Sequence, residues 1–94
     1  MKRINELFDV EEDFKVTSIH SDSRYVRKNS VFFCIDGLSV DGHKYIEDAI
    51  FLGAKCIVYS KPLVYKRRDI LYIKVNDVMG ELNRVADIFY DQPS

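Results

Sequence analysis

The sequence has no long hydrophobic run and almost no net charge, and each absence excludes a class of protein. No apolar stretch approaches the roughly 18 residues of a membrane span, and residues 1–20 lack the apolar segment of a signal peptide. We therefore expect a cytoplasmic chain that contacts no membrane. A formal net charge of -1 gives no electrostatic drive toward nucleic acid, so the basic 61–68 stretch is expected to be a solvated loop.

Signatures of catalysis are missing as well. The chain contains neither the glycine-rich dinucleotide motif nor the phosphate-binding P-loop, and no serine nucleophile elbow or carboxylate pair stands out. His43 has no second histidine or cysteine at metal-ligand spacing, so no metal site is expected. We expect no catalytic residue in this chain.

The cysteines are few, and both lie within apolar runs. Cys34 follows Phe32-Phe33, and Cys56 precedes Ile57-Val58. A free cysteine in such a run behaves as a small buried hydrophobe. Two buried thiols are therefore expected rather than a disulfide.

Hydrophobic periodicity predicts one α/β domain over residues 1–94, with a small mixed sheet of about four to five strands flanked by helices. After a short helix at 4–8, the expected order is strand, strand, helix, strand, strand, helix. The expected strands are 16–20, 31–35, 54–59 and 70–75, and the expected helices cover about 45–53 and 78–89. Strands joined through helices require at least one parallel pairing with a right-handed crossover.

Capping and turn residues place the ends of these elements. Asp41 is expected to cap the middle helix and Gly53 to end it. Asn76 or Asp77 should cap the last helix, which Gly80 weakens by about 1 kcal/mol relative to alanine. Residues 90–94 are expected to leave that helix as a linker, because a proline cannot continue it.

A first polar cluster, Ser21-Asp22-Ser23-Arg24, follows the first strand. Serine and aspartate bind backbone amides in loops, so this cluster is compatible with a purely structural turn. The hydroxyls at a strand end are equally suited to a polar ligand, and the guanidinium can pair with phosphate or with a carboxylate. Both interpretations stay open on spacing alone.

A second cluster, Leu38-Ser39-Val40-Asp41-Gly42-His43, precedes the middle helix. A helix N-terminus presents unpaired amides that suit a diphosphate, and a glycine lets the backbone approach a ligand closely. The alternative is that Asp41 only caps the helix and His43 only occupies its first turn.

Several short motifs, in this order, resemble the N-terminal domain of the Mur ligases, the bacterial cytosolic enzymes that add amino acids to the peptidoglycan precursor. The motifs are Asp22-Ser23-Arg24, Phe32-Phe33, Asp36-Gly37, Asp41-Gly42-His43, Tyr45-Ile46, Ala49, Gly53-Ala54, Phe89-Tyr90 and Pro93-Ser94. The resemblance is clearest over residues 16–94 and is strongest to the branch that synthesises the UDP-N-acetylmuramyl tripeptide. Lys28-Asn29 departs from the family's usual glycine turn, although asparagine tolerates the left-handed conformation.

The resemblance implies a substrate-binding role in peptidoglycan biosynthesis, and so in cell-wall formation, cell shape and division. The implied contacts to the UDP-sugar are Ser21, Ser23, Leu38, Ser39 and Val40, with Asp22, Arg24, Asp41, Gly42 and His43 as supporting loop residues. The full-length ligase would add diaminopimelate or lysine to UDP-MurNAc-L-Ala-D-Glu, using ATP and magnesium bound by central and C-terminal domains. This domain alone would be inactive, with its partners the UDP-MurNAc-peptide and those domains.

Two alternatives stay open. The MurF-type ligase, which adds D-Ala-D-Ala, carries similar motifs in its N-terminal domain. A stand-alone UDP-sugar-binding or protein-interaction module is the alternative from another class.

Overall fold

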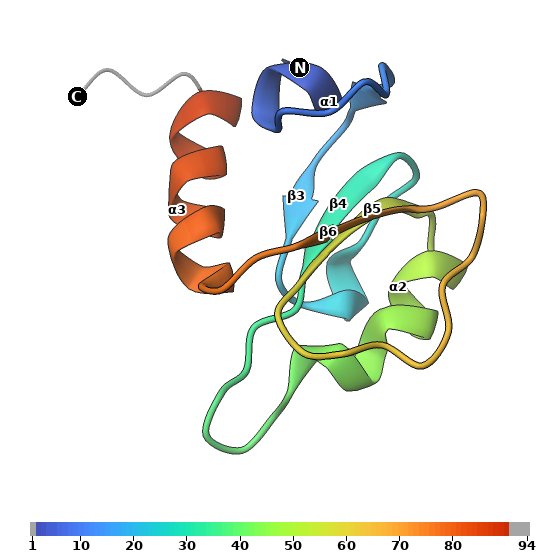
Figure 1. Ribbon diagram of the computed structural model, residues 1–94, viewed down its shortest axis with the longest axis vertical. Helices are drawn as coiled ribbons and strands as arrows, with labels where there is room; N and C mark the ends of the chain where they lie inside the picture. The colour runs from blue at the N-terminus through green and yellow to red at the C-terminus, as the bar shows by residue number, and fades with distance from the viewer. Residues whose placement is uncertain (1, 91–94) are drawn as a thin grey trace.

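A parallel four-stranded sheet forms the centre of the computed structural model, which describes residues 2–90 (Figure 1). Its strands, in spatial order, are β3 (Ile19–His20), β4 (Ser30–Phe33), β5 (Ala54–Tyr59) and β6 (Leu71–Lys74). All neighbouring strands pair in parallel. The strand predicted at 31–35 is fully buried over Val31 to Phe33, as expected for a strand covered on both faces.

A second, smaller sheet carries the antiparallel pairing. β1 (Lys2–Arg3) pairs with β2 (Lys15–Val16), and α1 (Ile4–Leu7) lies between them in sequence. The predicted α/β class with flanking helices is confirmed, whereas the predicted single strand at 16–20 is divided between two sheets. The chain passes from the small sheet to the main sheet at Thr17. The amide and hydroxyl of Thr17 donate to backbone carbonyls of the turn before β4, so Thr17 does not extend β2.

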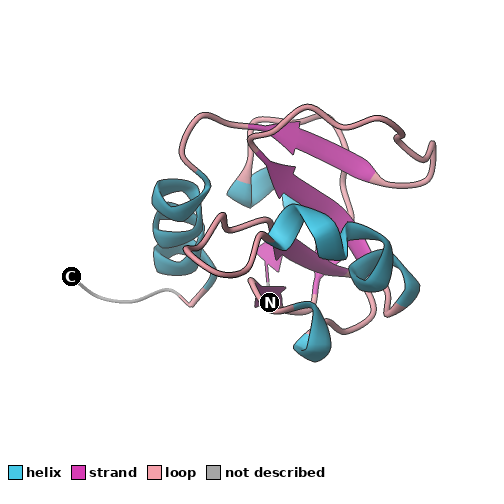
Figure 2. Cartoon of the chain, turned by 90° about the horizontal axis from the view of Figure 1, so that it is seen from below, coloured by secondary structure: helices cyan, strands magenta, loops and turns pink. Residues whose placement is uncertain are grey.

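Each face of the main sheet has its own hydrophobic cluster. Along β4, Val31 and Phe33 join the cluster beneath α1 and α3, whereas Phe32 and Cys34 join the one beneath α2. Figures 1 and 2 show α3 and α2 on opposite sides of the strands. The period-two alternation of a strand therefore supplies both layers of the core.

The last helix, α3 (Val78–Phe89), begins as the sequence predicts. Asp77 accepts a hydrogen bond from the Gly80 amide at 3.1 Å. A Cβ on Gly80 would lie 2.5 Å from Asp77 Oδ2, so this glycine gives the cap the room it needs. Val78 and Val85 are buried against the sheet.

The middle helix differs from its prediction, because a 3-10 turn precedes it. η2 (Gly42–Tyr45) leads into α2 (Ile46–Phe51), and Asp41 caps η2 by accepting from the His43 amide. Gly53 ends the segment at φ 116°, and Asn29 has φ 63°. Of the predicted linker at 90–94, residues 91–94 lie outside the described residues, and Tyr90 ends α3 as its C-cap.

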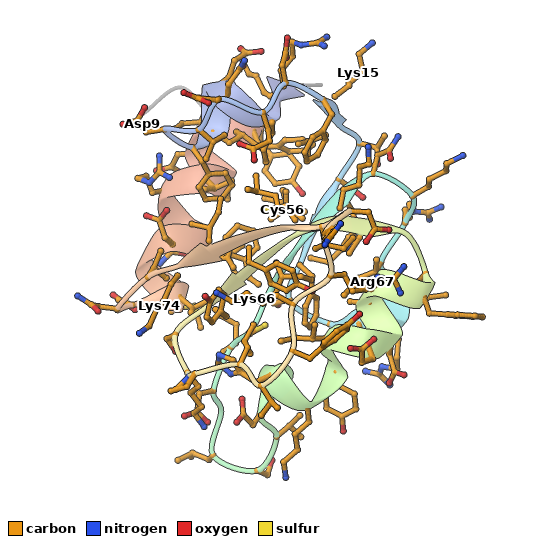
Figure 3. All side chains as sticks on the ribbon, turned by 45° about the vertical axis from the view of Figure 1, so that its right-hand side comes forward. Asp9, Lys15, Cys56, Lys66, Arg67 and Lys74 are labelled. Carbon is orange, nitrogen blue, oxygen red and sulfur yellow. The ribbon has the colours of Figure 1, made fainter. Side chains whose placement is uncertain are left out.

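Charged side chains surround the fold, and Cys56 lies inside it (Figure 3). Lys66, Arg67 and Arg68 are exposed, as expected of a solvated loop. Lys61 differs, because it forms ion pairs with Asp36 and Asp41. Within residues 2–90, no helix is long and apolar enough to cross a membrane.

Candidate functional site: a cavity at the carboxyl edge of the sheet

The loops that follow β3 and β4 meet at the carboxyl edge of the sheet, where ligands of open parallel sheets commonly bind. They enclose an open cavity of about 630 Å³. Its lining residues are Ser21, Asp22, Ser23, Arg24, Phe32, Ile35, Gly37, Val40, Gly42, Tyr45 and Met79. Residues from both polar clusters found in the sequence thus line one cavity.

The first loop forms a 3-10 turn, η1 (Ser23–Tyr25), capped by Asp22. Asp22 Oδ1 accepts from the Arg24 amide at 3.0 Å, and Asp22 Oδ2 accepts from Arg24 Nη2 at 2.7 Å. The hydrogen bonds from Arg24 lower the pKa of Asp22 to about 2. The guanidinium also lies over the ring of Tyr25, 5.7 Å from its centroid. These contacts place an exposed cation at the cavity wall.

Ser23 is a largely buried residue of this wall, although its hydroxyl oxygen is not fully enclosed by protein. The residue is only 9% exposed, yet its side chain makes no hydrogen bond with any residue in the described range 2–90. Ser21 lines the cavity on the same loop. A hydroxyl that has no protein partner and lines a cavity can donate a hydrogen bond to a ligand or accept one from it.

The second loop is a short hairpin. Asp36 and Asp41 form an antiparallel bridge, and the Gly37 amide donates to Val40 O at 2.8 Å. Gly37, Val40 and Gly42 line the cavity. Leu38 is fully exposed and Ser39 lies beside it at the tip, so these two predicted contacts face solvent rather than the cavity.

Amides at the start of η2 are already paired, which favours the alternative that Asp41 caps the helix over the interpretation that free amides bind a diphosphate. The Gly42 amide donates to Ile35 O, the His43 amide to Asp41 Oδ1 and the Lys44 amide to Asp41 O. Asp41 therefore caps η2, and Arg24 is the cationic side chain among the residues that line the cavity.

Sequence reasoning missed the apolar part of the cavity. Phe32 and Ile35 come from β4 and its exit, Tyr45 from η2 and Met79 from the first turn of α3. The apolar run at 31–35 marks the first two as strand residues, but it does not indicate which of them reach the cavity. No local signal could have placed Met79, because its position depends on how α3 packs back on the sheet.

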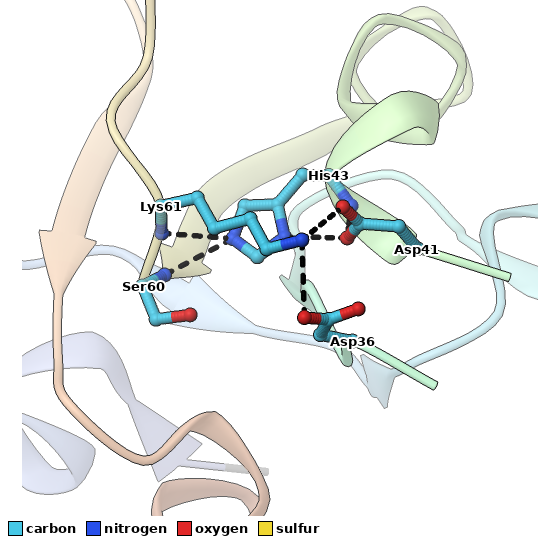
Figure 4. A network of polar contacts seen from close by, with 5 residues as sticks. All are labelled: Asp36, Asp41, His43, Ser60 and Lys61. Carbon is cyan, nitrogen blue, oxygen red and sulfur yellow. Dashed lines mark hydrogen bonds and ion pairs between the residues drawn. The ribbon is translucent and has the colours of Figure 1, made fainter. Parts of the chain in front are cut away.

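His43 and Asp41 do not line the cavity but belong to a hydrogen-bonded network beside it (Figure 4). His43 Nδ1 lies 2.7 Å from Asp41 Oδ1, and the amides of Ser60 and Lys61 donate to His43 Nε2 at 3.1 and 3.2 Å. Lys61 Nζ completes the network on Asp41 and Asp36. The hydrogen bond from Lys61 is the main cause that lowers the pKa of Asp41.

Within residues 2–90, no group of three or more histidine, cysteine, aspartate or glutamate residues could hold a metal ion. Burial raises the pKa of the Cys34 thiol to about 12, so this cysteine is not a nucleophile near neutral pH.

The chain resembles known ligases along most of its length. It is 39% identical over 87 residues to a UDP-N-acetylmuramoyl-L-alanyl-D-glutamate--2,6-diaminopimelate ligase of Fusobacterium nucleatum, covering 93% of this chain and 18% of that relative. A ligase of the same name from Clostridium tetani is 41% identical over 83 residues, covering 86% and 17%. A UDP-N-acetylmuramyl-tripeptide synthetase of Borreliella afzelii is 33% identical over 84 residues, covering 87% and 17%. The chain thus spans less than a fifth of the length of these relatives.

Solved structures and a family pattern agree with these relatives. MurF ligase from Thermotoga maritima in complex with ADP superimposes with a TM-score of 0.63 at 28% identity, covering 73% of this chain and 16% of that one. MurF from Acinetobacter baumannii gives a TM-score of 0.67 at 18% identity, covering 88% and 17%, which shows a shared fold. The pattern described as "Mur ligase family, catalytic domain" matches residues 15–90. Because this match extends over most of the chain, the protein belongs to the Mur ligase family.

Proposed function

We propose that residues 1–94 are the N-terminal substrate-recognition domain of a cytoplasmic, ATP-dependent ligase that adds the third amino acid, diaminopimelate or lysine, to UDP-MurNAc-L-Ala-D-Glu. The observation that carries this proposal is that the loops after β3 and β4 line one cavity. The names of the relatives that cover 86% to 93% of this chain support the choice of substrate.

In this proposal the UDP end of the substrate lies between the two loops. Ser21 and Ser23 offer hydroxyls, and Arg24 offers a guanidinium that suits a diphosphate. Because Arg24 is already paired with Asp22, it would share its charge between the carboxylate and the ligand. Leu38, Ser39 and Val40 would contact the part of the substrate that extends past the hairpin.

The chemical step would belong to other domains of the ligase. The described residues contain no metal-binding cluster, and the sequence has no phosphate-binding P-loop, so we assign no ATP or Mg²⁺ ligand to this chain. In the intact enzyme, ATP would activate the D-Glu γ-carboxylate as an acyl phosphate, which the incoming amine attacks. Binding energy from the remote UDP end would position that carboxylate for reaction.

A MurF-type ligase, which adds D-Ala-D-Ala, is the second candidate, because the structural neighbours named above are MurF enzymes. We favour the tripeptide synthetase, since relatives bearing that activity in their names reach 33% to 41% identity, against 18% to 28% for the MurF structures. A stand-alone UDP-sugar-binding module has no comparable support.

Titration of the 94-residue chain with UDP-MurNAc-L-Ala-D-Glu, followed by amide NMR, tests the binding site. We expect saturable shifts at amides of residues 21–24 and 37–42, and UDP alone should reproduce part of them. Glucose 6-phosphate, which lacks the uridine, serves as the control. An absence of shifts in the millimolar range, or shifts confined to other surfaces, would contradict the proposal.

A further inference from the structure

His43 is the centre of a network that joins two loops (Figure 4). We call the five residues Asp36, Asp41, His43, Ser60 and Lys61 the loop clasp. The first three lie after β4, in the hairpin and in η2, and the last two follow β5. Eighteen residues separate His43 from Lys61, so these contacts are tertiary rather than local.

The contacts of His43 define the state of its ring. Two backbone amides donate to Nε2, which can accept them only when that nitrogen carries no proton. The ring proton then lies on Nδ1 and is donated to Asp41 Oδ1 at 2.7 Å. The side chain is 8% exposed, and both of its nitrogens are engaged. His43 is therefore unsuited to act as a general base or to bind a ligand directly.

The hairpin that the clasp holds is also a wall of the cavity. Gly37, Val40 and Gly42 line the cavity and lie between Asp36 and His43 in sequence. The backbone of Gly42 packs tightly against the end of β4, because a Cβ on this residue would lie 2.9 Å from Ile35 N. Any change in how His43 meets Ser60 and Lys61 would therefore move or loosen this wall.

We propose that His43 is a positioning residue, whose neutral ring fixes the cavity-lining hairpin of residues 36–42 by accepting hydrogen bonds from the Ser60 and Lys61 amides. The consequence for substrate affinity rests on the proposed function, whereas the consequence for the hairpin does not. Removing the acceptor costs the part-buried hydrogen bond from the Ser60 amide and the more exposed one from the Lys61 amide, and the first loss is the larger because water replaces a part-buried partner less readily.

Two conservative variants divide the roles of the ring nitrogens. In His43→Gln the amide oxygen can take the place of Nε2 and accept from Ser60 and Lys61. In His43→Asn the amide nitrogen can take the place of Nδ1 and donate to Asp41, but the two backbone amides lose their acceptor. Lys44→Gln is the matched control, because Lys44 is exposed and its side chain has no hydrogen bond or ion pair within the described residues.

Hydrogen exchange at the Gly37 and Gly42 amides in the ligand-free chain measures the order of the hairpin. We expect at least about tenfold faster exchange in His43→Asn, and wild-type exchange within about threefold in His43→Gln and Lys44→Gln. Affinity for UDP-MurNAc-L-Ala-D-Glu should be reduced in His43→Asn and close to that of the wild type in His43→Gln and Lys44→Gln. Equal exchange in the Asn and Gln variants, or wild-type exchange in the Asn variant, would overturn the proposal.

NMR of the His43 ring nitrogens in the wild-type chain tests the proposed hydrogen bonds even where a variant fails to fold. A proton on Nδ1 and none on Nε2 is expected, and a proton on Nε2 would overturn the proposal. If the wild type does not bind the UDP-sugar peptide, the proposed function fails, whereas exchange in the ligand-free hairpin still decides the role of His43.

Discussion

Lys61 Nζ lies 2.7 Å from Asp41 Oδ2, which ties the loop after β5 to the residue that caps η2. The same ammonium is 3.0 Å from Asp36 Oδ2, so one cation joins both ends of the hairpin beside the cavity. These hydrogen bonds raise the pKa of Lys61, and the bond to Asp41 has a larger effect than the bond to Asp36. Two carboxylates that would otherwise repel each other are held together by this lysine.

Stability in acid should depend on Asp41. Its pKa in the folded chain is lowered below the ordinary value of about 3.9, so the folded state holds the charged form more strongly than the unfolded chain. The resulting stabilisation is complete above about pH 5 and is lost as the pH falls through the folded pKa. Asp41→Asn keeps the capping oxygen but removes the charge. We expect a loss of about 1 kcal/mol at pH 7 and a flatter decline between pH 5 and 2, by urea unfolding.

Asp87→Asn is the matched control for this acid series, because Asp87 is exposed and its side chain has no ion pair within the described residues. Its unfolding free energy should follow the wild type at each pH. Some slope should remain in the Asp41 variant, since arginines also lower the pKa of Asp22 and Glu81. Parallel curves for the wild type and Asp41→Asn would contradict this prediction.

Gly53→Ala should destabilise the fold by about 2–4 kcal/mol. Gly53 has φ 116°, and a Cβ there would lie 2.5 Å from Lys28 Cα, which is backbone that cannot easily move. Urea unfolding with an unchanged m-value measures the loss. In Gly80→Ala the new Cβ meets only the end of the Asp77 side chain, and the gain in helix propensity of about 1 kcal/mol offsets the weakened cap. A small effect is expected there, so equal losses in both variants would refute the argument.

Elements with strong local signals are predictable from the sequence. The strand at 54–59 is found with the predicted bounds, and Asp77 caps the last helix, because a short apolar run and a capping residue are encoded within a few residues. The 3-10 turn of η2 is not predictable in this way. Its amides bind Asp41 and Ile35, and the Ile35 partner depends on the preceding strand.

The candidate site also contains residues that the sequence predicts and contacts that it does not. Ser21, Ser23 and Val40 are predicted contacts that line the cavity, because polar loops at strand ends are visible in the sequence. The partners of His43 Nε2 are backbone amides of Ser60 and Lys61, so no residue type at these positions signals the two hydrogen bonds that His43 accepts. Leu38 and Ser39 stay predicted contacts to a substrate that extends beyond the cavity.

Both cysteines should resist alkylation in the folded chain. Burial, with a smaller effect of Asp41, raises the pKa of Cys34 to about 12, and burial raises the pKa of Cys56 further. The thiols belong to clusters on opposite faces of the sheet, so they should not form a disulfide with each other. Iodoacetamide at pH 8 should label neither thiol in buffer and both in guanidinium, as counted by mass spectrometry. Rapid labelling in buffer would contradict the buried placement.

Ser23→Ala should weaken binding of UDP-MurNAc-L-Ala-D-Glu by about 5- to 30-fold, because Ser23 lines the cavity and its hydroxyl has no partner within the described residues, so it is free to bind the ligand. Titration calorimetry or amide NMR measures the affinity of each chain. Ser30→Ala is the control, since Ser30 Oγ also has no partner within the described residues but is buried and lies outside the cavity lining. That variant should keep wild-type affinity and equal or higher stability. An unchanged affinity in Ser23→Ala would remove Ser23 from the proposed contacts, and equal losses in both variants would point to the fold rather than to the site.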